Sequence, residues 1–489
     1  MNKLRIIAFI CVCLLAIFML VSCKTQETNK SELNKTDGDT NTADAEAAAE
    51  ITEPEKVFPH EIRDLNGYTF RVLVDINDGN ALYYNDLDIA EEVGEVYNDS
   101  IYKRNLELKE NFNINFATVS KENISNDVKK VVNAGTDDYD LILPRFHSAW
   151  NLIPYCNDLM VIENLSLKES WYDQNCVENL SISNKLYFIT GDAFMKHYDG
   201  IMLLIFNKQM LKDHALADPY ALVGDGKWTL DVMSQMSRDV TKDLDGNAVM
   251  DRYDQWGYAL QSDVLGGMIN AAGLKFLSKD SNDIPVLQAN IERMSAAIDK
   301  ILSFYVDYSW DCLRDGKGAH LSAFWIFPES RALFNGIMLR YIAWQLRGVE
   351  FDFGILPFPK FDEAQERYYT SPNNFHTYSY MMPKSVSDPE TVAYIFDAMG
   401  FYGEQIIKPA YYDVCLTRKY TRDEESTEML DIIFKSTAYD LGIYANFGNI
   451  SESVRGMLEK GENTFVSMYE RQEDRATAAI EKFVDSIDG

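Results

Sequence analysis

The chain has 489 residues, of which 46% are hydrophobic and 25% are charged. This balance is typical of a globular protein and excludes disorder over most of the length, and the length predicts at least two lobes. Lys and Arg number 46 against 76 Asp and Glu, a formal net charge of −30 at pH 7. Phosphate backbones and anionic lipid surfaces repel so acidic a chain, so we expect no nucleic-acid partner.

The N-terminus has the pattern of an export signal. Lys3 and Arg5 precede an apolar run over 6–21, which is shorter than the ~20 residues that span a bilayer as a helix. The run ends in LVSC, which resembles the lipobox of bacterial lipoproteins and implies lipidation of Cys23. We predict a signal peptide over 1–22 and a lipidated flexible tether over 23–56, because that acidic segment holds too little apolar material to fold. A plain secreted protein or an uncleaved anchor is the alternative.

The cysteines do not indicate a metal or redox site. Four lie beyond the N-terminal segment, at Cys156, Cys176, Cys312 and Cys415, and no pair has CxxC spacing. A Cys156–Cys176 bridge is compatible with an exported protein, and so are free buried thiols.

Strand and helix patterns alternate along the body. Apolar residues alternate over 69–76 as in a strand, helical spacing follows over 96–112, and a second strand and helix follow over 114–119 and 126–135. A dense apolar strand over 138–144 completes the pattern, which predicts an open α/β sheet with right-handed crossovers. Further strands are expected within 201–211, 351–360 and 379–384, with a helix near 226–236, a packing role for Trp228, and a helical C-terminal third.

The order of several short motifs resembles that of the extracellular solute-binding proteins of bacterial ABC importers, specifically the large sugar-type group. The motifs are YNDSIYKRN, DYDLI, NKLYFITGD, FNKQML, GKWTLD and FGILPFPK. The resemblance implies a two-lobed α/β fold of the periplasmic-binding-protein type (type II), in which crossover strands join the lobes and the ligand lies in the cleft between them. The implied lobes are 57–200 with about 357–420, and 201–356 with about 421–489.

Candidate ligand-binding residues follow from this fold, because open α/β sheets bind ligands at the carboxyl ends of their strands. Aromatic rings can cover the C–H faces of a sugar, and Asp, Asn and Arg can bond its hydroxyl groups. The segments 145–155 and 191–200 lie at such positions, and the resemblance implies that 334–348 forms another cleft wall. The predicted ligand-binding residues are His147, Trp150, Trp171, Asp192, Tyr198, Asp199, Asn335, Arg340 and Trp344. Core packing is the alternative for each, and above all for the tryptophans.

One acidic loop has the spacing of an EF-hand-like calcium loop. The expected ligands, at positions 1, 3, 5, 7, 9 and 12, are Asp243, Asp245, Asn247, Val249 (through its backbone carbonyl), Asp251 and Asp254. Ala248 stands where such a loop requires Gly, and Asp254 is shorter than the usual Glu. We expect a structural calcium ion here; the alternative is an acidic turn.

Together these patterns predict a monomeric binding protein, not an enzyme, anchored by lipid on the extracytoplasmic face of the cell membrane. It would capture a carbohydrate, an oligosaccharide, and deliver it to the permease subunits of an ABC importer. Two alternatives stay open. A secreted glycoside hydrolase could use a carboxylate pair such as Asp192 with Asp199, or Glu329 with Asp311. A surface adhesin would also be compatible with the anchor.

Overall fold

The structure is a computed structural model that describes residues 56–76, 87, 89–260, 262–287, 290–311, 323–346, 348–412 and 423–488. Within it, Val57–Gly489 form one compact unit. The predicted signal peptide, Cys23 and the tether up to residue 55 lie outside the described residues, so they stay predictions.

The first lobe is built on a parallel three-stranded sheet. Its strands β1 (Tyr68–Ile76), β2 (Ile114–Glu122) and β3 (Leu141–Leu143) lie in the order β2-β1-β3. The connecting helices α2 (Val96–Phe112) and α3 (Ser125–Ala134) end at Asn113 and Gly135, whose φ angles of 52° and 64° turn the chain out of the helix. These elements follow the alternation that the sequence predicts over 69–144.

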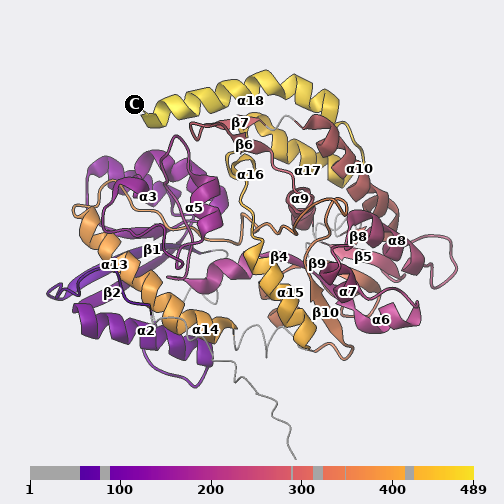
Figure 1. The fold of residues 1–489 in the computed structure, drawn as a ribbon, viewed down its shortest axis with the longest axis horizontal. Helices are drawn as coiled ribbons and strands as arrows, with labels where there is room; N and C mark the ends of the chain where they lie inside the picture. Colours follow the sequence, from indigo (N-terminus) through magenta and orange to yellow (C-terminus); the bar gives the residue numbers. More distant parts are fainter. Residues whose placement is uncertain are drawn as a thin grey trace, which may run out of the picture. The chain divides into compact units, whose positions relative to one another are not determined.

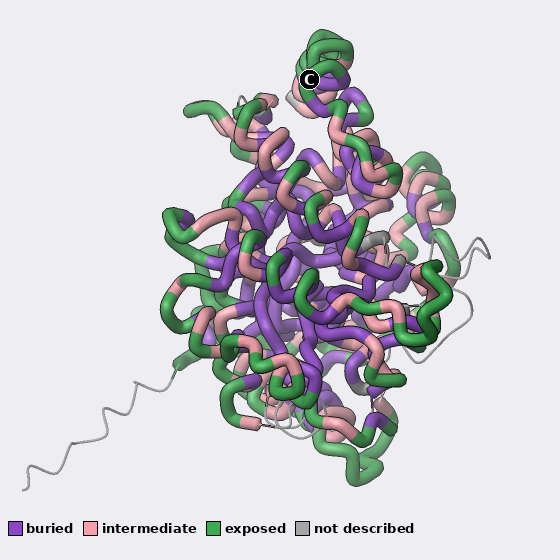
Figure 2. The backbone as a smooth tube through the Cα atoms, turned by 90° about the vertical axis from the view of Figure 1, so that its right-hand side faces the viewer, coloured by how far each residue is buried: buried purple, intermediate pink, exposed green. Residues whose placement is uncertain are grey.

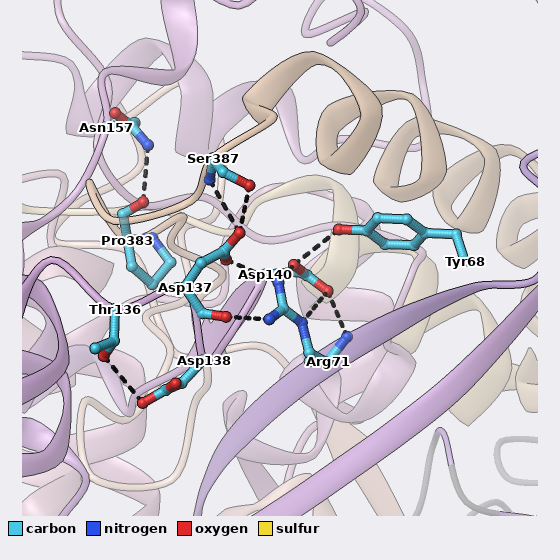
Figure 3. Close-up of polar contacts among 9 residues, drawn as sticks. All are labelled: Tyr68, Arg71, Thr136, Asp137, Asp138, Asp140, Asn157, Pro383 and Ser387. Carbon is cyan, nitrogen blue, oxygen red and sulfur yellow. Dashed lines mark hydrogen bonds and ion pairs between the residues drawn. The ribbon is translucent and has the colours of Figure 1, made fainter.

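A polar network fastens the segment before β3 to β1 (Figure 3). The Arg71 guanidinium forms ion pairs with Asp137 and Asp140, and the Tyr68 hydroxyl donates to Asp140 at 2.9 Å. Ser387 donates its hydroxyl to Asp137. Burial and, second, the neighbouring Asp140 carboxylate raise the pKa of the Tyr68 hydroxyl. The hydrogen bonds and ion pairs of this network position β3 beside β1.

The second lobe is built on a five-stranded mixed sheet in the order β10-β4-β9-β5-β8. Strand β4 is antiparallel to both neighbours, whereas β5 is parallel to β8 and β9. The strands are β4 (Met202–Asn207), β5 (Trp256–Leu260), β8 (Ser309–Asp311), β9 (Ala332–Met338) and β10 (Phe353–Leu356). Trp228 is fully buried beside this sheet and donates its indole N–H to the Pro357 carbonyl at 3.0 Å, which is the packing role predicted for it.

Helices and short elements cover and connect the sheets. In the first lobe they are α4 (Phe146–Ala149), η2 (Trp150–Tyr155), η3 (Leu159–Val161), α5 (Gln174–Leu180) and η4 (Met195–Gly200). Around the second sheet they are α6 (Lys208–Asp213), α7 (Pro219–Gly224), α8 (Leu230–Val240), α9 (Ser262–Ala271), the hairpin β6 (Leu277–Lys279) and β7 (Pro285–Leu287), α10 (Ile291–Tyr308), α11 (Ala323–Ile326) and α12 (Leu339–Gln345).

The C-terminal third is helical, and its helices are divided between the lobes (Figure 1). They are α13 (Pro389–Tyr402), η5 (Gly403–Ile407), α14 (Lys408–Ala410), α15 (Glu424–Lys435), α16 (Leu441–Ala445), η7 (Phe447–Asn449), α17 (Ile450–Lys460) and α18 (Phe465–Asp488). Helix α13 packs against α2, and α15 packs against β10. Figure 2 shows buried backbone through the middle of the unit and exposed backbone along its outer surfaces. The exact division of the chain into lobes stays a prediction.

Among the described residues, no helix combines the length and the apolar character that a membrane span requires.

Candidate functional site

Two antiparallel segments connect the sheets. Ile201, just before β4, pairs with Pro372, and the Asn373 N–H donates to the Gly200 carbonyl at 2.8 Å. The chain then continues along the first sheet, where residues 374–381 exchange backbone hydrogen bonds with 142–147. A single stretch, 371–381, therefore contacts the ends of both sheets.

Gly200 allows these segments to approach closely. A Cβ atom at this position would lie 2.2 Å from the Thr377 hydroxyl oxygen and 3.1 Å from the His376 carbonyl. Any larger residue would push the two segments apart, so glycine is a steric requirement here.

Charged side chains follow the strand ends at this junction. Asp75 is the penultimate residue of β1, and Arg145 follows β3 by two residues. The Arg145 Nε lies 3.4 Å from an Asp75 carboxylate oxygen, and the other oxygen accepts the Asn123 N–H at 3.0 Å. Arg340 follows the end of β9, in the first turn of α12. These positions agree with the general rule that ligands bind beyond the carboxyl ends of strands.

Two imidazoles complete what we call the polar cluster: Asp75, Arg145, His147, Arg340 and His376. An Arg340 Nη1 lies 3.4 Å from the His376 Nδ1, so the guanidinium donates to a neutral imidazole. Burial and, second, Arg340 lower the pKa of His376 to about 3. Burial and, second, Arg145 also lower the pKa of His147. Both imidazoles are therefore uncharged at neutral pH and can exchange hydrogen bonds with hydroxyl groups.

His147 has a polar atom in need of a partner. Its ring packs against Phe375, with 4.9 Å between the ring centroids, and its Nδ1 is buried with no hydrogen-bond partner among the described residues. Buried polar atoms are nearly always paired. A bound solute or water would satisfy this one.

Two hollows are lined in part by chain neighbours of the polar cluster, Phe375 in one and Val74 in the other. A hollow with a cavity volume of about 70 Å³ is lined by Met202 of β4, Gly267 of α9, Phe375 of the connecting segment and Arg455 of α17, among others. A second hollow, with a cavity volume of about 20 Å³, lies at the edge of the first sheet. Its lining includes Val74, Leu143, Phe194, Lys196 and Tyr378. Both hollows combine apolar and polar lining residues.

The structure places two of the predicted residues at this junction. His147 and Arg340 belong to the polar cluster. Asn335 lies in the middle of β9, opposite Ile205 and Ala259, where its amide Nδ2 is buried without a hydrogen-bond partner among the described residues. The side chain of Trp344 lies outside the described residues, so its role stays a prediction.

Trp150 and Trp171 have packing partners. The Trp150 ring stacks on Phe483 of α18 at 4.3 Å and meets the edge of Phe447, so two rings of the C-terminal region occupy its faces. Trp171 is 2% exposed and donates its indole N–H to Asp397 at 3.1 Å. Its ring has almost no surface to offer a ligand, and here the structure favours the core-packing alternative.

The predicted residues of 191–200 form contacts within the protein. Asp192 is 2% exposed and lies 2.8 Å from the Lys408 Nζ. Asp199 accepts the Tyr411 hydroxyl at 2.9 Å, and the Tyr198 ring packs against Tyr411 and Phe434. The three side chains connect the segment 192–199 to the C-terminal third of the chain.

The calcium-loop residues lie close together. Carboxylate oxygens of Asp243, Asp245 and Asp254 lie within 4.8 Å of one another. Ala248 has a φ of +64°, the left-handed conformation for which such a loop normally uses Gly. Backbone N–H groups already donate to both oxygens of Asp243 and to both oxygens of Asp254. The donor types suit a hard cation, and calcium stays a prediction.

Cys156 and Cys176 are both buried free thiols. Of the two alternatives that the sequence leaves open, the structure therefore has the free thiols. Cys312 and Cys415 lie outside the described residues.

Sequence reasoning missed Asp75, Arg145 and His376. Asp75 and Arg145 could have been found, because both stand at the carboxyl ends of predicted strands. His376 could not, because its position depends on which distant segment pairs with 142–147.

Comparison with known proteins identifies the fold. No protein-family model and no curated protein matches the sequence. Among solved structures, UspC of M. tuberculosis has a TM-score of 0.54 at 14% identity, with 84% of this chain and 100% of that chain covered. A sugar transporter of Rhizobium etli in an open conformation has a TM-score of 0.54 at 13% identity, covering 86% and 99%. A solute-binding protein of Agrobacterium radiobacter K84 in complex with ribitol has a TM-score of 0.52 at 12% identity, covering 85% and 100%. These matches confirm the predicted α/β, two-lobed fold of the periplasmic-binding-protein type.

Proposed function

We propose that this protein is an extracytoplasmic solute-binding protein that captures a carbohydrate and delivers it to the permease of an ABC importer. The observation that carries the proposal is the polar cluster, in which residues from the ends of both sheets meet at the connecting segment 371–381. The similar structures include a sugar transporter and a ribitol complex, which supports a polyhydroxylated ligand. The lipid anchor at Cys23 and the monomeric state are further parts of the proposal.

The geometry suits capture by closure of the two lobes. A solute held by His147 of the first lobe and Arg340 of the second makes its full set of contacts only when both lobes approach it. Binding would therefore stabilise the closed form by the difference in contacts between open and closed states. The permease would then distinguish the loaded protein by its shape.

An enzyme is the alternative, and both carboxylates of the first pair suggested for it have partners within the protein. Asp192 is paired with Lys408, and Asp199 accepts a hydrogen bond from Tyr411. Neither lines the two hollows beside the polar cluster.

A thermal-shift screen of the purified protein against mono- and oligosaccharides tests the proposal. A ligand that binds only the folded state raises the melting temperature, by an amount that increases with its concentration above Kd. We expect a shift with at least one saccharide, which chromatography then recovers unchanged. A saccharide recovered cleaved would support the hydrolase, and no shift with any saccharide would contradict carbohydrate capture.

A further inference from the structure

The last helix of the chain connects the two lobes. Helix α18 has 24 residues, a length of roughly 36 Å at the usual rise per residue. It packs against α10 and α17 of the second lobe, and Figure 1 shows it extending from α10 toward the first lobe. Near its end, the Phe483 ring stacks on Trp150 of the first lobe with 4.3 Å between the centroids. The Ile487 carbonyl accepts a hydrogen bond from the Lys185 Nζ at 2.6 Å.

The β6–β7 hairpin makes a second set of contacts between the lobes. Its strand β7 packs against α18. The Asp283 carboxylate accepts the Ser181 hydroxyl and the Asn184 N–H, both at 3.0 Å. The Lys279 Nζ donates to the Glu178 carbonyl at 2.7 Å. All three partners lie in or just after α5 of the first lobe.

We call these two sets of contacts the interlobe clamp; its members from the second lobe are Lys279, Asp283, Phe483 and Ile487. The interlobe clamp adjoins the first hollow. Ile443 of α16 and Arg455 of α17 line that hollow together with Phe375, and α17 packs against α18. Beside Ile443, the Tyr444 ring stacks on Phe146 of the first lobe at 4.9 Å. Separation of the lobes at the interlobe clamp would therefore widen this hollow.

The contacts of the interlobe clamp are of a kind that can open without unfolding the lobes. They are made by the end of a terminal helix and by a hairpin, and such peripheral elements open at lower free energy than core strands do. Interfaces between parts of one chain permit relative motion unless they are large and hydrophobic. Because the contacts join protein groups only, they favour the closed arrangement whether or not a solute is bound.

From these observations we infer that the interlobe clamp holds the lobes closed over the first hollow without any solute, and that the clamp raises the affinity for solute. A larger closed fraction raises the apparent affinity of any solute that binds the closed form. The first part of this inference concerns the protein alone, and the second part rests on the proposed function.

X-ray scattering of the purified protein without saccharide tests the first part. Phe483→Ala removes the stacking on Trp150, and Asp283→Ala removes two hydrogen-bond acceptors from the hairpin. Each variant should have a larger radius of gyration than the wild type, and the double variant should have the largest. Val466→Ala, at an exposed position of α18, is the control and should scatter as the wild type does.

Melting temperatures show which variants fold. If Phe483→Ala does not fold, Phe483→Leu takes its place, since leucine keeps much of the apolar volume and removes the stacked ring. Unchanged radii of gyration in the folded variants of Phe483 and Asp283 would overturn the clamp.

Affinity tests the second part, with the saccharide that gives the largest shift in the thermal screen as the probe. The clamp variants should bind it about fivefold more weakly than the wild type because a smaller fraction of each is closed. Saturating saccharide should return their radii of gyration to that of the wild type. Larger radii with unchanged affinity would overturn the link between clamp and solute. If no saccharide binds, the proposed function is contradicted, and scattering still decides whether the clamp closes the lobes.

Discussion

At the scale of single residues, the predicted site residues differ in whether their polar atoms have partners within the described part of the protein. The polar cluster contains His147, whose buried Nδ1 has no hydrogen-bond partner in the part of the chain that the structure describes, whereas Trp171 and Asp192 each have a polar partner within the protein. Residue type alone could not separate residues that pack within the protein from candidate ligand-binding residues, because tryptophan and aspartate suit both roles. Burial and partners separate them.

Asp397 holds the predicted site residue Trp171 within the protein. This fully buried carboxylate accepts hydrogen bonds from the Trp171 indole at 3.1 Å and the Tyr172 hydroxyl at 3.0 Å, and it lies 2.9 Å from the His60 imidazole. Asp397→Ala leaves these donors without an acceptor, so we expect the free energy of unfolding to fall by about 3 kcal/mol. Urea denaturation measures the change. Asp239→Ala, an exposed control, should change stability by less than about 0.5 kcal/mol.

Asp192 makes stability depend on pH. Burial raises the pKa of this carboxyl to about 7, although Lys408 opposes the shift. The folded protein therefore holds a proton that the unfolded chain releases above pH ~4. The contribution of Asp192 to stability is present at low pH and is lost as pH rises from about 4 to 7.

Asp192→Asn tests this dependence. The difference in unfolding free energy between wild type and variant should shift in favour of the variant as pH rises from 4 to 8. A pH-independent difference would show that the Asp192 pKa is close to its ordinary value.

At the scale of elements, the β6–β7 hairpin connects distant parts of the chain. Its turn residue Asp283 accepts the Ser181 hydroxyl and the Asn184 N–H, both at 3.0 Å. Nearby, α18 reaches the first lobe, where the Lys185 Nζ donates to the Ile487 carbonyl at 2.6 Å and Phe483 stacks on Trp150. Figure 1 shows the hairpin lying beside α18.

Asp283→Ala should loosen this connection without unfolding the protein. The loop at 181–185 loses two of its hydrogen-bond acceptors, so we expect faster amide exchange there, measured by mass spectrometry, and unchanged exchange in β4 and β9. Asp474→Ala on the exposed side of α18 is the control. If amide exchange became equally faster throughout the chain, the hairpin would stabilise the whole fold and not only its connection to 181–185.

The acidic loop at 243–254 is the second element with a direct test. If Asp243, Asp245 and Asp254 hold calcium, the ion binds the folded state and raises its melting temperature. The shift should disappear in Asp245→Ala and should not occur with magnesium at the same concentration. Absence of a calcium shift in the wild type would leave the loop as an acidic turn.

At the scale of the whole molecule, much of the fold could be predicted from the sequence and little of the site. The alternation over 69–144 was predictable because each strand and helix buries its own periodic apolar face. The cluster was not, because it forms where 371–381 pairs with 142–147, and such long-range pairing leaves no local pattern. Only Asp75 and Arg145 could have been predicted as site residues from the sequence, because both stand at the carboxyl ends of predicted strands.

The central claim is that one solute contacts both lobes at the polar cluster. Hydrogen exchange of the purified protein, with and without a saccharide found in the thermal screen, tests it most directly. We predict slower exchange in 142–147, 338–342 and 371–378 together, since bound solute restricts both sheet ends and the segment between them. Protection confined to one lobe, or found instead at the surface hollow formed by 160–177, would contradict the claim.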